Sequence, residues 1–534
     1  MCAPVQYPKI ERQHREDKKI EEYPESEHKE SYDTSSTLPP PPARFRDSPR
    51  RSAGEPLPQL AFLLFNMQQP TGGGDMRPLI ATFFIAFGSL VAPEISCGSL
   101  GLHGPDTEVT IYDSNPSHLW NRLHATIFVR PDVPSTAEVP DALDPPLWFH
   151  SKHLLAQPSH ARILRILDEF LETHGERLIQ DPGKRAMLQR DLWAVFDWSV
   201  EREPNRPEEP AYEKEKLELQ PRLVEIMRRI ALTPEQIRLL PSNYAQAVAS
   251  GLFAKEYDPA HPDRPFLPPD LFDLNGPWVE MYNNGTNEPF AVGHQSAFSR
   301  SAFLILIRLP GGRKATFDYF RTLWDFPQPW IPRPDDDRHE QTEVNPELPQ
   351  FPVGTQVALA RQMILFDSVG NLQGTPITES VQIRVYRSVA SHAERDESAN
   401  QDEALKKSGQ DFYQFTLSRS LLFASKGLKA TAPDEREFSM FNAFGPDEGS
   451  PAQFISLDKY RPVLKTCFWC HLGQGIDSVN SRSHLLKPDW LMHEYPPSAY
   501  QPPLPWWGYV DTHWKQNRYD WGLLSGYWKA TGAH

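Results

Sequence analysis

The chain has 534 residues, 39% of them hydrophobic, which is enough for two or three domains with ordinary cores. Its formal net charge of −15, with no basic run after residue 97, argues against nucleic acid or an anionic membrane as a partner. Four cysteines are too few for a secreted fold stapled by disulfides. The sequence carries no P-loop, dinucleotide-binding, zinc-protease or serine-hydrolase motif.

Residues 1–75 are rich in charge, with a proline run at 39–42 and a glycine tract at 72–74. They have almost no apolar periodicity, so they cannot bury enough surface to offset the entropy of ordering. We expect this leader to carry no fold. Two interpretations stay open: a gene start set upstream of a true start at Met76, or a disordered cytoplasmic tail on a signal anchor.

Residues 76–97 have the pattern of a signal peptide. Met76 and Arg77 form a short charged start, and an apolar stretch over 78–92 follows. At about 14 residues this stretch is short for a membrane span, which needs about 20. We therefore expect export to the periplasm or cell envelope and no transmembrane span in the mature chain, with peripheral membrane association left open.

Residues 105–260 are predicted to form a helical domain. Apolar residues follow the 3.6-residue period over 163–171 and again over 188–196, and both stretches are expected to face a core. The Thr-Pro-Glu-Gln capping pattern at 233–236 predicts the start of a short helix. Pro221 interrupts a further helical pattern, so the stable part of that helix is expected to begin at Pro221.

Residues 261–450 are predicted to form a β-rich α+β domain. An apolar run predicts a buried strand over 303–309, and Thr316 is expected to cap the helix that follows. Strict alternation over 381–386 indicates a half-buried strand, which is expected to pair with 357–366 in a hairpin. The remaining predictions here are a strand at 413–417 and proline-rich loops at 265–269, 327–352 and 445–452.

The most informative short string is Cys467-Phe-Trp-Cys470-His471. Two thiols three positions apart can reach the two vinyl groups of one porphyrin, while the next imidazole comes beneath the iron. With 4 Cys and 18 His in the chain, chance gives roughly 0.001 such pentamers, so coincidence does not explain the string. It predicts one covalently bound haem c.

Other interpretations of the cysteine pair stay open. A CxxC with tryptophan inside it is similar to redox dithiol sites, although those follow a strand in a βαβ unit, and Pro462 limits any preceding helix to one turn. Zinc is a second possibility, with His484 and His493 as further ligands, but their spacing departs from that of zinc fingers. A structural disulfide would need no adjacent histidine.

Residues 453–534 form an irregular segment rich in tryptophan and proline, in which six of the 14 tryptophans lie between Trp490 and Trp528. Large rings can pack on a porphyrin edge and exclude water, which raises the reduction potential. They can equally form a core or anchor the segment on the β-rich domain. A carbohydrate-binding face is a third interpretation.

The distal iron ligand is predicted to be Met492, the only thioether after the motif. The chain between His471 and Met492 is long enough to loop back over a porphyrin. His484 and His493 compete for this role. Met492 can instead pack in a core, because methionine often fills gaps there.

At the motif, residues 460–475 resemble c-type cytochromes. The resemblance implies that Cys467 and Cys470 hold the porphyrin by thioether bonds and that His471 is the proximal ligand. Small soluble cytochromes c take a distal methionine from a downstream loop within a compact helical fold, and this proline-rich tail departs from that pattern. The large pieces before the motif are similar to exported bacterial proteins that carry one CxxCH.

The expected fold is α+β, with a helical domain, a β-rich domain and a C-terminal haem-bearing segment. The expected function is that of an exported monohaem protein that exchanges electrons with a redox partner protein, or that senses a redox state or a small ligand. The motif names a cofactor and no reaction, so catalysis is left open. The alternative is a haem-free exported protein that uses the dithiol in thiol–disulfide exchange or presents a tryptophan-rich binding surface.

Overall fold

The computed structural model describes residues 109–129, 153–200, 212–283, 300–332, 342–389, 409–435, 464, 471, 473–479, 490–492 and 512–532. All of these lie in one compact unit, Cys97–His534. Several predictions fall outside the described residues: those for 1–75, 76–97 and 445–452, and those for Cys467, Cys470, His484 and His493.

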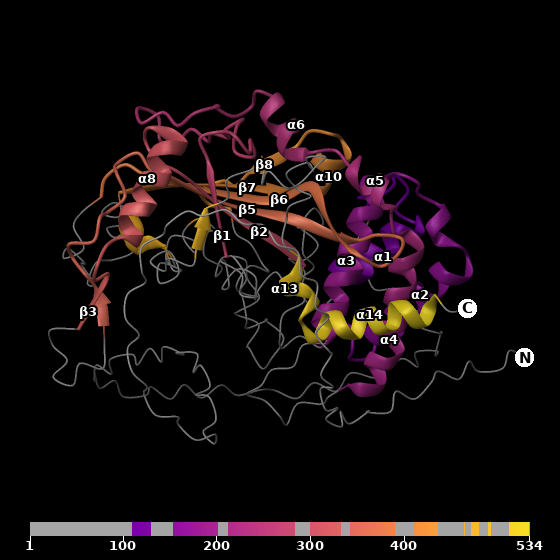
Figure 1. Ribbon diagram of the computed structural model, residues 1–534. Coiled ribbons are helices and arrows are strands. Elements are labelled where there is room, and N and C mark those ends of the chain that lie inside the picture. The colour runs from indigo at the N-terminus through magenta and orange to yellow at the C-terminus, as the bar shows by residue number, and fades with distance from the viewer. Residues whose placement is uncertain are drawn as a thin grey trace, which may run out of the picture. The chain divides into compact units, whose positions relative to one another are not determined.

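A seven-stranded antiparallel sheet runs through the described part of the chain (Figure 1). The predicted hairpin is confirmed, with Val357 opposite Arg384. The strands predicted at 303–309 and 413–417 are confirmed as well. From edge to edge the strands are β8 (Leu428–Ala430), β7 (Gln410–Leu417), β6 (Leu372–Tyr386), β5 (Gln356–Phe366), β2 (Ser301–Arg308), β1 (Val279–Asn283) and β9 (Trp490–Met492).

Helices account for most of the remaining described structure, and the antiparallel sheet together with these helices confirms a mixed α+β fold. The helical patterns at 163–171 and 188–196 are confirmed, and Thr233 caps the helix after it through the predicted box with Gln236. The helices are α1 (Leu119–Phe128), α2 (Ser159–Glu172), η2 (Gly175–Arg177), α3 (Pro182–Val200), α4 (Glu213–Ile230), α5 (Pro234–Arg238), α6 (Asn243–Ala249), α8 (Gly312–Trp324), α10 (Arg419–Phe423), η5 (Gly475–Ser478), α13 (His513–Gln516) and α14 (Tyr519–Thr531).

Two predicted helix starts are wrong. Helix α4 runs through Pro221. Proline has no N–H, so the carbonyl of Leu217 lacks its usual donor within the helix, and this is tolerated because Leu217 is exposed to water. Thr316 lies inside α8 instead of capping it. Its hydroxyl donates to the carbonyl of Gly312 and accepts from the N–H of Leu309, so it ties the helix to the end of β2.

The prediction of a loop over 327–352 is wrong in part. Two short strands, β3 (Trp330–Pro332) and β4 (Thr342–Val344), pair antiparallel within it. Both strands of a two-stranded ribbon are edge strands. The exposed Pro332 at the end of β3 is tolerated because an edge position does not need its N–H for a bond to a further strand.

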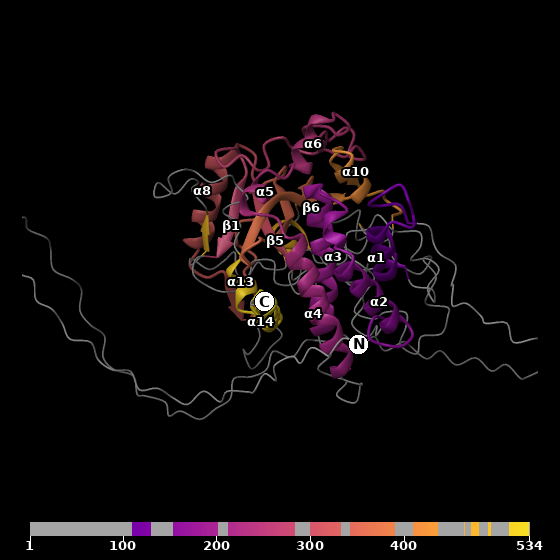
Figure 2. The same cartoon turned by 90° about the vertical axis from the view of Figure 1, so that its right-hand side faces the viewer.

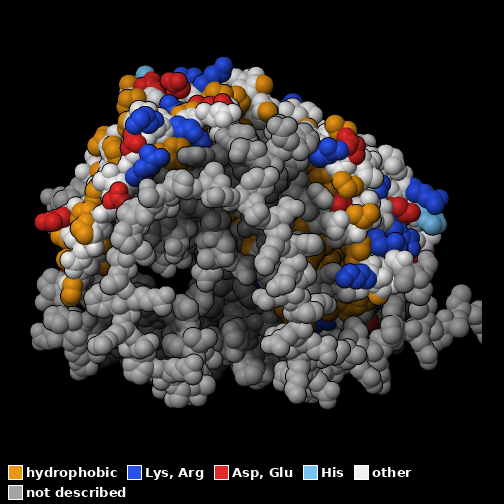
Figure 3. Space-filling model, viewed as in Figure 1, with side chains coloured by type: hydrophobic (Ala, Val, Ile, Leu, Met, Phe, Trp, Pro, Cys, Tyr) orange, Lys and Arg blue, Asp and Glu red, His pale blue; other side chains and the backbone are white. Residues whose placement is uncertain are grey.

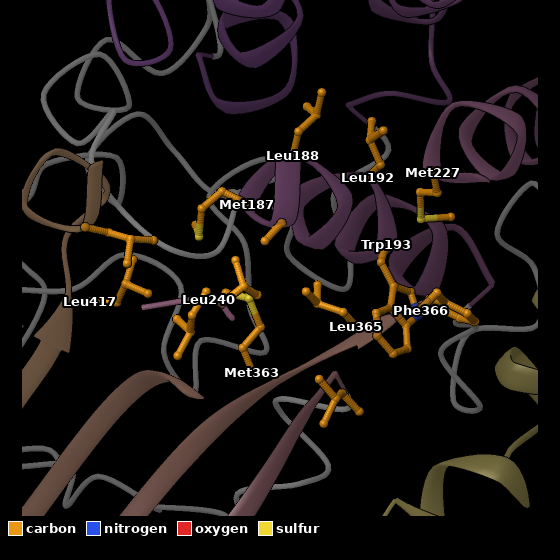
Figure 4. Packing of buried hydrophobic residues seen from close by; sticks show 14 of the residues in the cluster. Met187, Leu188, Leu192, Trp193, Met227, Leu240, Met363, Leu365, Phe366 and Leu417 are labelled. Atoms are coloured by element: carbon orange, nitrogen blue, oxygen red, sulfur yellow. The ribbon is translucent and has the colours of Figure 1, made fainter. Parts of the chain in front are cut away.

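One hydrophobic core joins the helices to one face of the sheet. In Figure 4 the ring of Trp193 on α3 lies beside Phe366 at the end of β5, with ring centroids 4.5 Å apart. Figure 2 shows α3 and α4 side by side next to this end of the sheet. The sheet contributes alternate residues to this core: Ala302, Leu304, Leu306, Ala358, Ala360, Val381, Ile383, Val385, Tyr413, Phe415 and Leu417.

The opposite face of the sheet packs in a second core. Ile307 and Val357 point to this side, because they alternate with residues of the first core along β2 and β5. Phe320 of α8 packs on them, and so does Ile476 of η5. The sheet is therefore covered on both faces, and one of the covers is the segment that directly follows the CxxCH motif.

Helix α3 buries charged side chains as well as apolar ones. Its Arg190, Asp191 and Asp197 are each at most 1% exposed, so the helix is enclosed on nearly all sides. Each charge has a partner on a different element, because an unpaired buried charge would be strongly destabilising. The pairs are Arg190–Glu379 (2.7 Å), Asp191–Arg419 (2.9 Å) and Asp197–Lys515 (2.9 Å).

Helix α14 is docked on the turn of the β5–β6 hairpin. The rings of Trp521 and Trp528 both stack on Phe366, at centroid distances of 5.0 and 5.2 Å. The indole of Trp528 also lies against Gly370 in the turn. For these two tryptophans the interpretation as anchors on the sheet is confirmed.

No helix among the described residues is long and apolar enough to cross a membrane. On the face seen in Figure 3, acidic and basic side chains are mixed over the described elements.

Gly370 tests the docking of α14. Its φ is +89°, and an added Cβ would lie 2.7 Å from Nε1 of Trp528, so Gly370→Ala is expected to lower the free energy of unfolding by more than about 1 kcal/mol. Gly526→Ala is the matched control, because nothing lies within 4 Å of that position in the interior of α14, and it should raise the same free energy by about 0.5–1 kcal/mol. Urea titrations measure both. A Gly370→Ala protein as stable as the wild type would mean that α14 does not rest on the turn.

Buried tyrosines predict a loss of stability at alkaline pH. Burial raises the pKa of Tyr112, Tyr244 and Tyr319 well above the ordinary value of 10. The folded state thus keeps protons that the unfolded state releases, so the free energy of unfolding is expected to fall as pH rises above about 10. Urea titrations across this range, with tyrosinate absorbance recorded in parallel, measure it. Tyr319→Phe should reduce the slope, and ionisation of every tyrosine near pH 10 in the folded protein would contradict the expectation.

Candidate haem-attachment site

His471, the histidine of the CxxCH motif, is held on the second face of the sheet. Its side chain is only 9% exposed. The imidazole Nδ1 lies 2.8 Å from the backbone carbonyl oxygen of Ser478. A carbonyl oxygen can only accept a hydrogen bond, so Nδ1 carries the proton and the lone pair of the neutral ring is on Nε2.

Ser478 is the centre of the contacts that hold this imidazole. Nη1 of Arg384 donates to both the carbonyl oxygen and Oγ of Ser478, each at 3.0 Å. Oγ donates to the carbonyl of Gly475 at 2.8 Å, and so accepts from the hydroxyl of Tyr386 at 2.6 Å. Ser478 itself is fully buried. Arg384 therefore holds the carbonyl that fixes the tautomer of His471, and Tyr386 holds the side chain of the same serine.

Two glutamines fasten the backbone of the same loop. Nε2 of Gln410, on β7, donates to the carbonyl oxygens of His471 (3.1 Å) and Gly473 (2.6 Å). On the other side Oε1 of Gln350 accepts from the N–H of Ile476 at 2.9 Å, and its Nε2 donates to the carboxylate of Asp477 at 3.2 Å. These bonds satisfy backbone groups that would otherwise be buried without partners.

Two glycines allow the loop to pack this closely. Gly475 has φ +52°, and a Cβ on it would overlap the side chain of Gln350. A Cβ on Gly473 would overlap the backbone carbonyl of Asp477. The sequence Gly473-Gln-Gly475 thus has a structural role directly after the motif.

The loop changes how β6 is buried. The alternation over 381–386 predicts a strand with one solvated face, and that prediction is wrong: Gln382, Arg384 and Tyr386 are buried as well. The 473–479 loop covers Arg384 and Tyr386. Arg384, Tyr386, Gln410 and Ser478 were not identified from the sequence. The only signal in the sequence is that polar residues alternate with apolar ones along the strand. That pattern usually marks a solvated face, and it does not reveal that the 473–479 loop covers this face.

The structure does not bring Met492 to His471. Met492 lies in β9, the edge strand, and the register across the sheet runs from it through Met281, Ile305, Leu359 and Gln382 to Gln414 on β7. The backbone of His471 is bonded to Gln410 of β7, and its ring lies near that of Phe412 on the same strand. Five strand spacings of about 4.8 Å separate β9 from β7, or about 24 Å. The described residues do not test the distal role of Met492, which stays a prediction.

The residues around His471 fit the proximal side of a haem. The imidazole is buried, its Nδ1 proton is committed to a carbonyl, and Nε2 is left as the basic nitrogen, which is the usual arrangement for a metal-bound histidine. The ring of Phe412 on β7 lies 6.5 Å from that of His471 and adds an apolar wall. Within the described ranges, no group of three or more His, Cys, Asp or Glu side chains is placed to hold a metal ion.

Gly473→Ala is expected to loosen the loop. The new Cβ must displace the carbonyl of Asp477, which strains the turn and weakens the bond between Nδ1 of His471 and the carbonyl of Ser478. Amide exchange in 473–479 should become at least about tenfold faster, while β5 and β6 stay protected. Hydrogen–deuterium exchange mass spectrometry measures both. Gly522→Ala, at an open position of α14, is the control, and unchanged loop exchange in Gly473→Ala would contradict the close packing.

No protein-family model, curated protein or solved structure matches the chain. A functional assignment therefore depends on the Cys467-Phe-Trp-Cys470-His471 string and on the way His471 is held.

Proposed function

We propose that the chain is an exported protein similar to monohaem c-type cytochromes, with haem c bound through Cys467 and Cys470 and with His471 as the proximal iron ligand. Its role is electron transfer with a redox partner protein, or the sensing of a redox state or small ligand. The observation that carries the proposal is the 2.8 Å bond from Nδ1 of His471 to a buried carbonyl, because it prepares Nε2 to bind a metal.

The side chains near the motif have distinct tasks in this proposal. Haem, when bound, supplies a one-electron couple or a site for a small ligand. His471 offers Nε2 and keeps its proton on Nδ1. Arg384 and Tyr386 hold Ser478 in place, and Gln410 holds the backbone of His471. Burial of the imidazole excludes water from this side.

The proposal includes a division of labour along the chain. Residues 76–97 direct export to the periplasm or cell envelope, the helices over 105–260 and the sheet over 261–450 form the scaffold, and residues 453–534 carry the haem. The shared core between α3 and the sheet supports a scaffold role for both parts. The distal ligand stays open among Met492, His484 and His493.

Covalent attachment is tested with cysteine variants made together with a cytochrome c maturation system. Cys467→Ser and Cys470→Ser should each lower haem staining on a denaturing gel, because thioether bonds survive denaturation and ordinary haem contacts do not. The double variant should lose the stain. Cys97→Ser, outside the motif, is the control and should stain as the wild type does.

A pyridine haemochrome spectrum of the wild type separates this proposal from the haem-free alternative. A c-type spectrum in the periplasmic fraction supports both the cofactor and export. A wild-type protein without haem, or a double cysteine variant that stains unchanged, would refute the proposal and leave the dithiol or the tryptophan-rich surface as the functional element.

A further inference from the structure

Arg384 shares an acceptor with the proximal histidine. The carbonyl oxygen of Ser478 accepts from Nδ1 of His471 at 2.8 Å and from Nη1 of Arg384 at 3.0 Å. Two donors on one oxygen compete for its electron density. The bond from His471 is therefore weaker than it would be to an unshared carbonyl, and the imidazole gains less negative character from it.

Arg384 also differs from the other buried arginines of the described chain. Arg190 and Arg361 pair with Glu379, and Arg419 pairs with Asp191. Arg384 is 6% exposed, and among the described residues no carboxylate lies within ion-pair distance of it; its bonds go to the neutral groups of Ser478. A buried cation that no described carboxylate neutralises costs stability, so its presence beside His471 calls for a role there.

We propose that Arg384 is a positioning residue that raises the reduction potential of the haem iron, an inference that rests on the function proposed above. In the couple, ferric iron gains one electron from the redox partner protein and becomes ferrous. A positive charge in a buried environment disfavours the more positive ferric form. A less basic imidazole ligand acts in the same direction, since it donates less charge to ferric iron. The two effects of Arg384 add.

The test measures the potential of the haem-loaded full chain by redox titration with mediators. Arg384→Gln removes the charge and keeps an amide donor, and at a fixed electrode potential it should lower the ratio of ferrous to ferric protein about tenfold, which for one electron is about 59 mV. Arg384→Lys keeps the charge and should stay within about twofold of the wild type. Arg387→Gln is the matched control, because Arg387 lies three residues after Arg384, just beyond the end of β6, and is 40% exposed and paired with Asp411. Its ratio should not change.

Gln382→Glu keeps the test decisive if Arg384→Gln does not fold. It places a near-isosteric carboxylate two residues from Arg384 on the same face of β6, so it should lower the ratio as well. Thermal unfolding is recorded for every variant. A lower melting temperature with an unchanged potential would show that Arg384 has only a structural role and would overturn the inference. A wild type without haem would instead overturn the proposed function, and the inference with it.

Discussion

Three buried ion pairs made by α3 hold distant parts of this chain together. Arg190 pairs with Glu379 on β6, Asp191 with Arg419 on α10 and Asp197 with Lys515 on α13. Each pair is buried, so moving one partner would leave a charge of the pair away from solvent and short of its closest counter-ion. Such pairs also fix the position of α3 along its axis, because a shift of the helix would place its charged side chains against apolar ones.

Strand β6 connects this helix to the candidate site. Glu379 receives Arg190 from α3, and five residues later Arg384 holds the carbonyl to which His471 donates. The two contacts are parts of one strand, whose hydrogen bonds to β5 and β7 keep it rigid. The orientation of the imidazole is thus tied to the main core of the protein through a short stretch of backbone.

Sequence reasoning succeeded where the signal is local. The hairpin of β5 and β6 follows from alternation and a turn, and the box between Thr233 and Gln236 depends on adjacent residues. It failed where packing decides. Helix α4 continues through Pro221 because its apolar side chains are buried on both sides of the proline. The role predicted for Met492 rests on residue type and chain length and stays a prediction, and neither of these features indicates that β9 pairs with β1.

The neighbours of His471 could not be found from the sequence for a related reason. Arg384 and Ser478 are 94 residues apart, and Gln410 lies 61 residues before His471. No local sequence pattern links these distant residues, and only the folded sheet brings them together. The identity of the motif is local, whereas the environment that sets the chemistry of its histidine is not.

The long separations also have a consequence for the order of events during maturation. The bonds that fasten the loop of His471 to Gln410, Arg384 and Gln350 close 61 to 127 residues of chain, whereas the bond from Nδ1 of His471 to Ser478 closes only seven. Closing the longer loops costs more entropy. Until β6 is in place, Arg384 does not hold the carbonyl of Ser478, so the local bond that selects the tautomer of His471 has no support from the sheet. For a cofactor attached at this histidine before the sheet has formed, slower sheet formation would lengthen the time available for loading, and faster formation would shorten it.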